Sequence, residues 1–115
     1  MVKKILVVDD EEFIDELLQQ HLGKAGFQTI SFFNSQDALE YIENNPSSID
    51  LAIIDHNMPG ISGAALAERL RAMMPELPII IMAKPQEGIE FGEYTLLKKP
   101  ATKDELLEAI KKALV

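Results

Sequence analysis

Acidic side chains stand directly after two apolar runs of this sequence, and their placement could support metal chemistry. Asp9 and Asp10 follow the run Ile5–Val8, and Asp55 follows the run Leu51–Ile54. If both runs are buried parallel strands, the three carboxylates meet where the strands end, at the edge where open α/β sheets bind their ligands. Carboxylates held that close together repel one another unless a cation lies between them. The spacing therefore predicts a cation site.

Mg²⁺ is the cation that this donor set fits best. It keeps several of its waters and needs only one or two protein carboxylates together with a phosphate. The backbone carbonyl of Asn57 can supply one more oxygen. Lys99 precedes Pro100, which biases it to an extended backbone, and its ammonium group could reach an anion on Asp55. An aspartate can act as a phosphoryl acceptor, so a carboxylate between a cation and a lysine suggests phosphoryl chemistry.

Strands and helices that could position these residues alternate along the chain. Short apolar runs predict strands covered on both faces, and these runs lie at Ile5–Val8, Gln28–Phe33, Leu51–Ile54, Ile79–Met82 and Tyr94–Leu97. Apolar stripes with helical spacing separate most of the runs, and a further stripe follows the last run after Thr102 and Glu105, which have capping-box spacing. The alternation predicts a parallel sheet with helices on both faces.

One connection is shorter than this pattern requires. Residues 84–93 separate the fourth and fifth predicted strands and hold one proline and two glycines. A crossover between parallel strands normally takes a dozen or more residues and includes a helix. We therefore expect a shortened or missing helix there.

Composition narrows the classes of function. The 115 residues suit one domain over residues 1–115, and 47% of them are hydrophobic, which argues against disorder. The net charge of −8 argues against direct nucleic-acid binding. The apolar runs are too short to span a membrane. The chain has no cysteine, so a cytoplasmic location is the default expectation.

Three motifs in order make the sequence resemble a known family. Val7-Val8-Asp9-Asp10-Glu11, then Ile54-Asp55-x-x-Met58-Pro59-Gly60, then Lys99-Pro100 is similar to the receiver domain of response regulators in two-component signalling, and the likeness covers the whole chain. The resemblance implies a flavodoxin-like, doubly wound five-stranded parallel sheet of order 2-1-3-4-5. It also implies Asp55 as the phosphoacceptor, Asp9 and Asp10 as Mg²⁺ acids, and Lys99 as the phosphate-contacting lysine.

The same resemblance implies partners. The phosphoryl donor would be a phosphohistidine on a sensor histidine kinase or a phosphotransfer protein. The signal would pass through protein contacts to a downstream target or an attached output domain. Such a domain catalyses only its own phosphorylation and dephosphorylation and turns over no external substrate.

Three features depart from the family pattern, and all affect its switch. Receivers usually end the fourth strand in a Ser or Thr that hydrogen-bonds the phosphoryl group, whereas Ala83 stands there. The family commonly has an aromatic residue where Leu96 stands. The third departure is the short crossover at residues 84–93. Together they keep open an alternative, a pseudo-receiver that binds its partner regardless of phosphorylation.

Other interpretations of the same residues are weaker. Asp10 alone could serve as a helix N-cap, and Asp55 alone could form an Asx turn with Asn57. A dehalogenase-like phosphatase needs a second acid where Asn57 stands, and a dinucleotide-binding domain needs a glycine-rich turn where Asp9-Asp10-Glu11-Glu12 stands.

Overall fold

A five-stranded parallel sheet forms the centre of the molecule. The computed structural model describes residues 2–84, 94–99 and 101–114. The strands follow the order β2-β1-β3-β4-β5 across the sheet, and every neighbouring pair is parallel. Their bounds are β1 Lys4–Val8, β2 Gln28–Phe32, β3 Leu51–Asp55, β4 Ile79–Ala83 and β5 Thr95–Lys98. The predicted topology is confirmed, and each predicted strand lies within one residue of its observed bounds.

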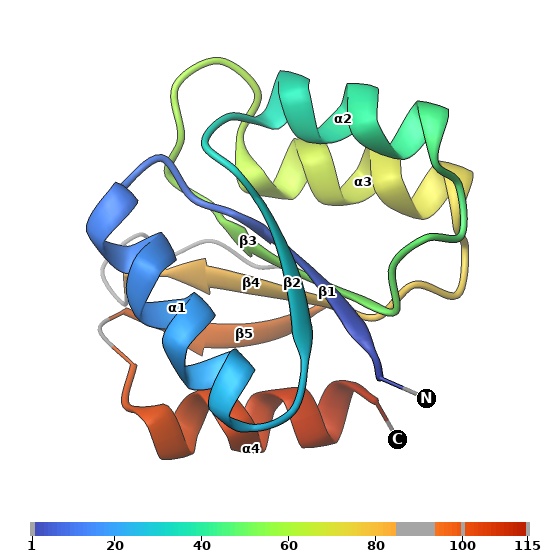
Figure 1. Cartoon of the computed structure of the whole chain (residues 1–115). Coiled ribbons are helices and arrows are strands. Elements are labelled where there is room, and N and C mark those ends of the chain that lie inside the picture. Colours follow the sequence, from blue (N-terminus) through green and yellow to red (C-terminus); the bar gives the residue numbers. More distant parts are fainter. Residues whose placement is uncertain (1, 85–93, 100, 115) are drawn as a thin grey trace.

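Four helices cover the two faces of the sheet in the described residues. Their bounds are α1 Glu12–Lys24, α2 Ser35–Asn44, α3 Gly63–Met73 and α4 Lys103–Ala113. Helices α1 and α4 lie on one face, and α2 and α3 lie side by side on the other (Figure 1). The fold is therefore the predicted doubly wound α/β arrangement. The predicted shortening of the helix within residues 84–93 concerns residues 85–93, which lie outside the described residues.

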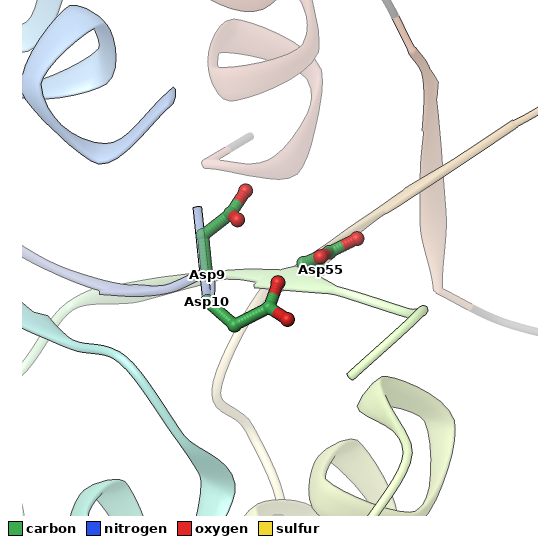
Figure 2. A group of neighbouring side chains, drawn as sticks. All are labelled: Asp9, Asp10 and Asp55. Carbon is green, nitrogen blue, oxygen red and sulfur yellow. The ribbon is translucent and has the colours of Figure 1, made fainter. Parts of the chain in front are cut away.

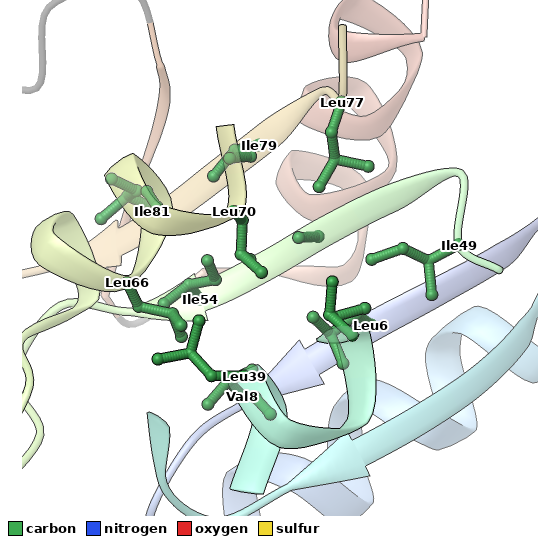
Figure 3. Packing of buried hydrophobic residues seen from close by; sticks show 14 of the residues in the cluster. Leu6, Val8, Leu39, Ile49, Ile54, Leu66, Leu70, Leu77, Ile79 and Ile81 are labelled. Atoms are coloured by element: carbon green, nitrogen blue, oxygen red, sulfur yellow. The ribbon is translucent and has the colours of Figure 1, made fainter. Parts of the chain in front are cut away.

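Alternation along the central strands divides the core into two clusters. In β1, Leu6 and Val8 pack towards α2 and α3, whereas Ile5 and Val7 pack towards α1 and α4. Figure 3 shows the first cluster, in which side chains of the sheet meet Leu39, Leu66 and Leu70 from the two helices. Strands that are covered on both faces have no row of side chains facing solvent, which explains why they are continuous apolar runs in the sequence.

Short polar side chains fix where three of the helices begin. The side chains of Asn34, Ser62 and Thr102 accept hydrogen bonds from the backbone N–H three residues later. Thr102 and Glu105 form the predicted capping box at α4. At α1 the N-cap is Glu11, with no side-chain cap hydrogen bond, so Asp10 does not cap this helix.

Arg71 on α3 ties together the amino-terminal ends of two strands. Its Nε donates to the carbonyl oxygen of Leu77, 3.0 Å away, just before β4. Its guanidinium carbon lies 5.2 Å from the ring centroid of Tyr94, just before β5. One side chain thus holds the starts of β4 and β5 against α3.

Among the described residues, none of the helices has the length and apolar character needed to cross a bilayer.

Candidate functional site

The ends of β1 and β3 bring the predicted acids together. Val8 pairs with Ile54 in the sheet, so the residues that follow them, Asp9 and Asp55, are neighbours at the carboxyl edge. Asp10 comes next along the chain, and its carboxylate turns towards the other two (Figure 2). One oxygen from each of the three side chains lies within 4.8 Å of the others. The predicted convergence of Asp9, Asp10 and Asp55 is confirmed.

This donor set fits a hard divalent cation. Octahedral Mg²⁺ binds oxygens at about 2.0–2.1 Å, so its ligands lie roughly 3 to 4.2 Å apart. The three oxygens therefore need only a small contraction. Asp9 is fully buried, yet its Oδ2 accepts no hydrogen bond from the described residues. Its contact among the described residues is an ion pair with the Lys99 ammonium at 3.4 Å, so this oxygen can contact a cation without losing a hydrogen bond.

Backbone hydrogen bonds orient the two buried carboxylates. Asp9 Oδ1 accepts from the N–H of Glu11 at 2.9 Å, and Asp55 Oδ1 accepts from the N–H of Asn57 at 3.3 Å. The second contact is an Asx turn. The Asx turn and the acid cluster therefore coexist, and the turn fixes the direction of the Asp55 carboxylate.

Lys99 lies opposite the acids and contacts two of them. Its Nζ is 3.0 Å from Asp55 Oδ1 and 3.4 Å from Asp9 Oδ2. Its backbone N–H donates to the carbonyl oxygen of Ala83 at 2.9 Å, which joins the ends of β4 and β5. The ammonium is thereby held where it neutralises both buried carboxylates. The sequence predicted its approach to Asp55, but not its contact with Asp9.

Burial dominates the titration of the two inner acids. It raises the pKa of Asp9 from 3.8 to about 6, although the Glu11 N–H and the Lys99 ammonium act to lower it. Burial likewise raises the pKa of Asp55, against the lowering effect of Lys99. Burial acts to lower the pKa of Lys99, but Asp55 and Asp9 outweigh it and the pKa is raised. The lysine therefore remains a cation, and the site favours added positive charge.

A close backbone approach shapes the loop after β3. Gly63, the first residue of α3, donates its N–H to the carbonyl oxygen of His56 at 3.0 Å. A Cβ on Gly63 would lie only 2.6 Å from the Cα of His56. Gly60 adopts a φ of +80°, a conformation that glycine tolerates without strain. Nothing in the sequence indicated that Gly63 would make a close contact.

Comparison with known proteins identifies the family. A family model described as the response regulator receiver domain matches residues 5–111. The chain belongs to this family. The receiver domain is 33% identical to sporulation initiation phosphotransferase F of Bacillus subtilis, over 99% of this chain and 95% of that protein. It is 34% identical to the alkaline phosphatase synthesis transcriptional regulatory protein PhoP of Bacillus subtilis, but spans only 49% of it.

Solved structures agree with this assignment. A response regulator receiver domain protein from Clostridium thermocellum superposes with a TM-score of 0.89 at 28% identity, covering 98% of this chain and 94% of that one. The chemotaxis protein CheY4 of Vibrio cholerae superposes with a TM-score of 0.85 at 26% identity, covering 99% and 100%. The receiver domain is therefore a module of two-component, phosphorylation-based signalling.

This receiver domain departs from the family pattern at three places, and two of them lie among the described residues. Ala83 is the last residue of β4 and is 4% exposed, one position beyond Met82, which pairs with Asp55. Its side chain offers no hydroxyl to the acid cluster. Leu96 on β5 is 45% exposed, whereas its neighbour Leu97 is buried. The third departure falls on residues 85–93, outside the described part of the chain.

Proposed function

We propose that this single domain, residues 1–115, is phosphorylated on Asp55 with Mg²⁺ held by Asp9, Asp10, Asp55 and the backbone carbonyl of Asn57. The observation that carries the proposal is the position of Lys99, whose Nζ is 3.0 Å from Asp55 Oδ1 beside the acid cluster. A relative of matching length, named a phosphotransferase, supports phosphoryl transfer as the chemistry. The donor would be a phosphohistidine on a sensor histidine kinase or phosphotransfer protein.

The transfer itself requires little from the protein beyond position and charge. An oxygen of Asp55 attacks the phosphorus, the phosphorus–nitrogen bond breaks, and its electron pair returns to the imidazole, which takes up a proton. Lys99 then exchanges its contact with the Asp55 carboxylate for one with a phosphoryl oxygen, which neutralises charge that develops during the transfer. Mg²⁺, when bound, neutralises further phosphoryl charge.

The proposed output is a change of protein contacts in the cytoplasm. A downstream protein or an attached output domain would receive the signal, and no external substrate would be turned over. Transmission of the signal requires that a structural change at Asp55 spreads to the protein surface. Ala83 and Leu96 lack the side-chain groups through which receivers usually pass on this change.

Phosphorylation can be tested with a small-molecule donor. Incubation with acetyl phosphate and Mg²⁺ should retard the protein on a Phos-tag gel, and Asp55→Asn should abolish the retarded band. Asp104→Asn, which alters a carboxylate of α4 far from the acid cluster in sequence, is the matched control and should behave as the wild type. Absence of a retarded band from the wild-type protein would overturn the proposal.

A second candidate is a pseudo-receiver whose partner binding ignores the phosphoryl group. The exposed Leu96 and the hydroxyl-free Ala83 favour it, because both remove groups through which receivers usually couple the site to the surface. Beryllofluoride, a phosphoryl mimic, separates the two candidates. Equal affinity for the partner protein with and without beryllofluoride would select the pseudo-receiver.

A further inference from the structure

A pocket separate from the acid cluster lies between α1 and α4. Its volume is about 560 Å³, within the roughly 300–1,000 Å³ typical of small-molecule sites. Side chains of β4, β5 and the two helices line it, and both helices lie on the same face of the sheet (Figure 1). The apolar side chains that line it include Ile14, Leu17, Met82, Leu97 and Leu106. Such a cavity is suited to the apolar body of a ligand.

The charge around this pocket has the opposite sign to the charge of the chain. Three lysines line it, Lys84, Lys98 and Lys99, against the single carboxylate of Glu11, in a protein of net charge −8. Lys99 is engaged by Asp55 and Asp9, but no carboxylate of the described residues lies within ion-pair distance of Lys84 or Lys98. Both side chains are exposed, and Lys98 also lies close enough to the exposed Glu105 carboxylate to interact with it electrostatically.

We propose that the α1–α4 pocket binds a small amphipathic anion. Its apolar body would occupy the space over Leu97 and Leu106, and its carboxylate or similar head group would contact Lys84 and Lys98. A pocket of about 560 Å³ has the volume of a site for one small molecule, whereas a standard protein interface buries roughly 800 Å² on each partner. The occupant is therefore a metabolite-sized anion with a hydrocarbon or aromatic body.

Lys99 belongs both to this pocket and to the acid cluster. The same side chain lines the pocket and lies 3.0 Å from Asp55 Oδ1. An anion seated beside Lys99 would compete with Asp55 for the ammonium group. This consequence rests on the proposed function of Asp55, whereas binding itself does not require phosphorylation.

Octanoate is a suitable probe, and methyl NMR of the wild-type protein is a suitable readout. Octanoate should shift the methyl signals of Leu17, Leu97 and Leu106 in a saturable manner. Octyltrimethylammonium, with the same chain and opposite charge, and acetate, with the charge and no chain, should bind at least tenfold more weakly. Equal binding of octanoate and the cation, or shifts confined to other residues, would overturn the proposal.

Two variants test the head group and the body separately. Lys84→Gln with Lys98→Gln should weaken octanoate binding roughly two- to thirtyfold, the range expected when two exposed ion pairs are lost. Leu17→Trp, at a 36% exposed position, should fill the pocket and abolish binding while the protein stays folded by its NMR spectrum. Unchanged affinity in both variants would contradict the site. Methyl shifts that follow protein concentration instead of octanoate would show that a second copy covers the pocket, which would also overturn the proposal.

Acetyl phosphate labelling then separates this inference from the proposed function. With octanoate bound, phosphorylation of Asp55 should slow at least threefold in the wild type and be unaffected in Leu17→Trp. Octanoate binding without any phosphorylation would leave the pocket established and the phosphoacceptor proposal refuted. Phosphorylation without octanoate binding would support the phosphoacceptor proposal and refute the pocket proposal.

Discussion

At the scale of single residues, ionisation of the Asp9 carboxyl has opposite effects on folding stability and on cation binding. Burial raises its pKa from 3.8 to about 6. The folded state therefore holds the proton more tightly than the unfolded state does. The stability gained from this proton is fully present below pH 3.8 and is lost as the pH rises through about 6. At neutral pH the metal-free protein carries an unfavourable buried charge.

Replacing Asp9 by asparagine should relieve that charge. In EDTA at pH 7, we expect Asp9→Asn to raise the free energy of unfolding by roughly 1–3 kcal/mol, because a pKa difference of one unit corresponds to about 1.4 kcal/mol. The difference should vanish below pH 4. Urea denaturation at several pH values measures it, with Glu68→Gln at an exposed carboxylate of α3 as control. Equal stabilities of wild type and Asp9→Asn at every pH would contradict the prediction.

The same protonation should control metal affinity. Mg²⁺ binds the ionised carboxylate, so protons compete with it once the pH falls below the pKa of Asp9, about 6. We expect the dissociation constant for Mg²⁺ to be nearly constant from pH 7 to 8 and to rise by roughly tenfold per unit at low pH. Calorimetric titration would measure it. Asp9→Asn should bind weakly and show a smaller pH dependence, since only the raised pKa of Asp55 then acts. A wild-type affinity that is constant down to pH 5 would speak against the site.

At the scale of elements, the sequence predicted the positions of the strands better than the side-chain contacts between them. The run Leu51–Ile54 is apolar at every position because β3 is covered on both faces, so its position could be predicted. The capping box of Thr102 and Glu105 is local, and it was predicted too. The contact of Lys99 with Asp9 joins residues ninety positions apart through side-chain rotamers, which periodicity does not encode. The α1–α4 pocket was unpredictable for the same reason, since it depends on how two helices pack.

Gly63 offers a test of one such contact. A Cβ at this position would lie 2.6 Å from the Cα of His56, against backbone that cannot swing aside. We expect Gly63→Ala to cost about 1–3 kcal/mol of stability and to weaken Mg²⁺ binding by displacing the loop after Asp55. Thermal unfolding and Mg²⁺ titration would measure the two effects.

Gly23→Ala is the matched control for that substitution. Gly23 lies within α1, and a Cβ there meets nothing within 4 Å. Since alanine is the better helix former by up to about 1 kcal/mol, this variant should be as stable as the wild type or more so. If Gly63→Ala were tolerated as well as Gly23→Ala, the close approach would not be a structural requirement.

At the scale of the whole molecule, Ala83 leaves the carboxyl end of β4 without a hydroxyl for the proposed phosphoryl group. Ala83→Thr should add a hydroxyl beside Asp55, and a hydrogen bond to a charged group is worth about 1.5–3 kcal/mol. We expect beryllofluoride to bind about tenfold more tightly or better, with NMR shifts that extend further along β5. Ala83→Val has nearly the same shape without the hydroxyl. Equal gains in the threonine and valine variants would exclude a hydrogen-bond effect.

Arg71 anchors the end of the sheet that lies opposite the acid cluster. Its contacts with Leu77 and Tyr94 anchor the beginnings of β4 and β5 to α3, while the opposite ends of these strands carry Ala83 and Lys99. If Lys99 exchanges partners as proposed, the resulting displacement of β5 would be largest at its carboxyl end and smallest beside the guanidinium.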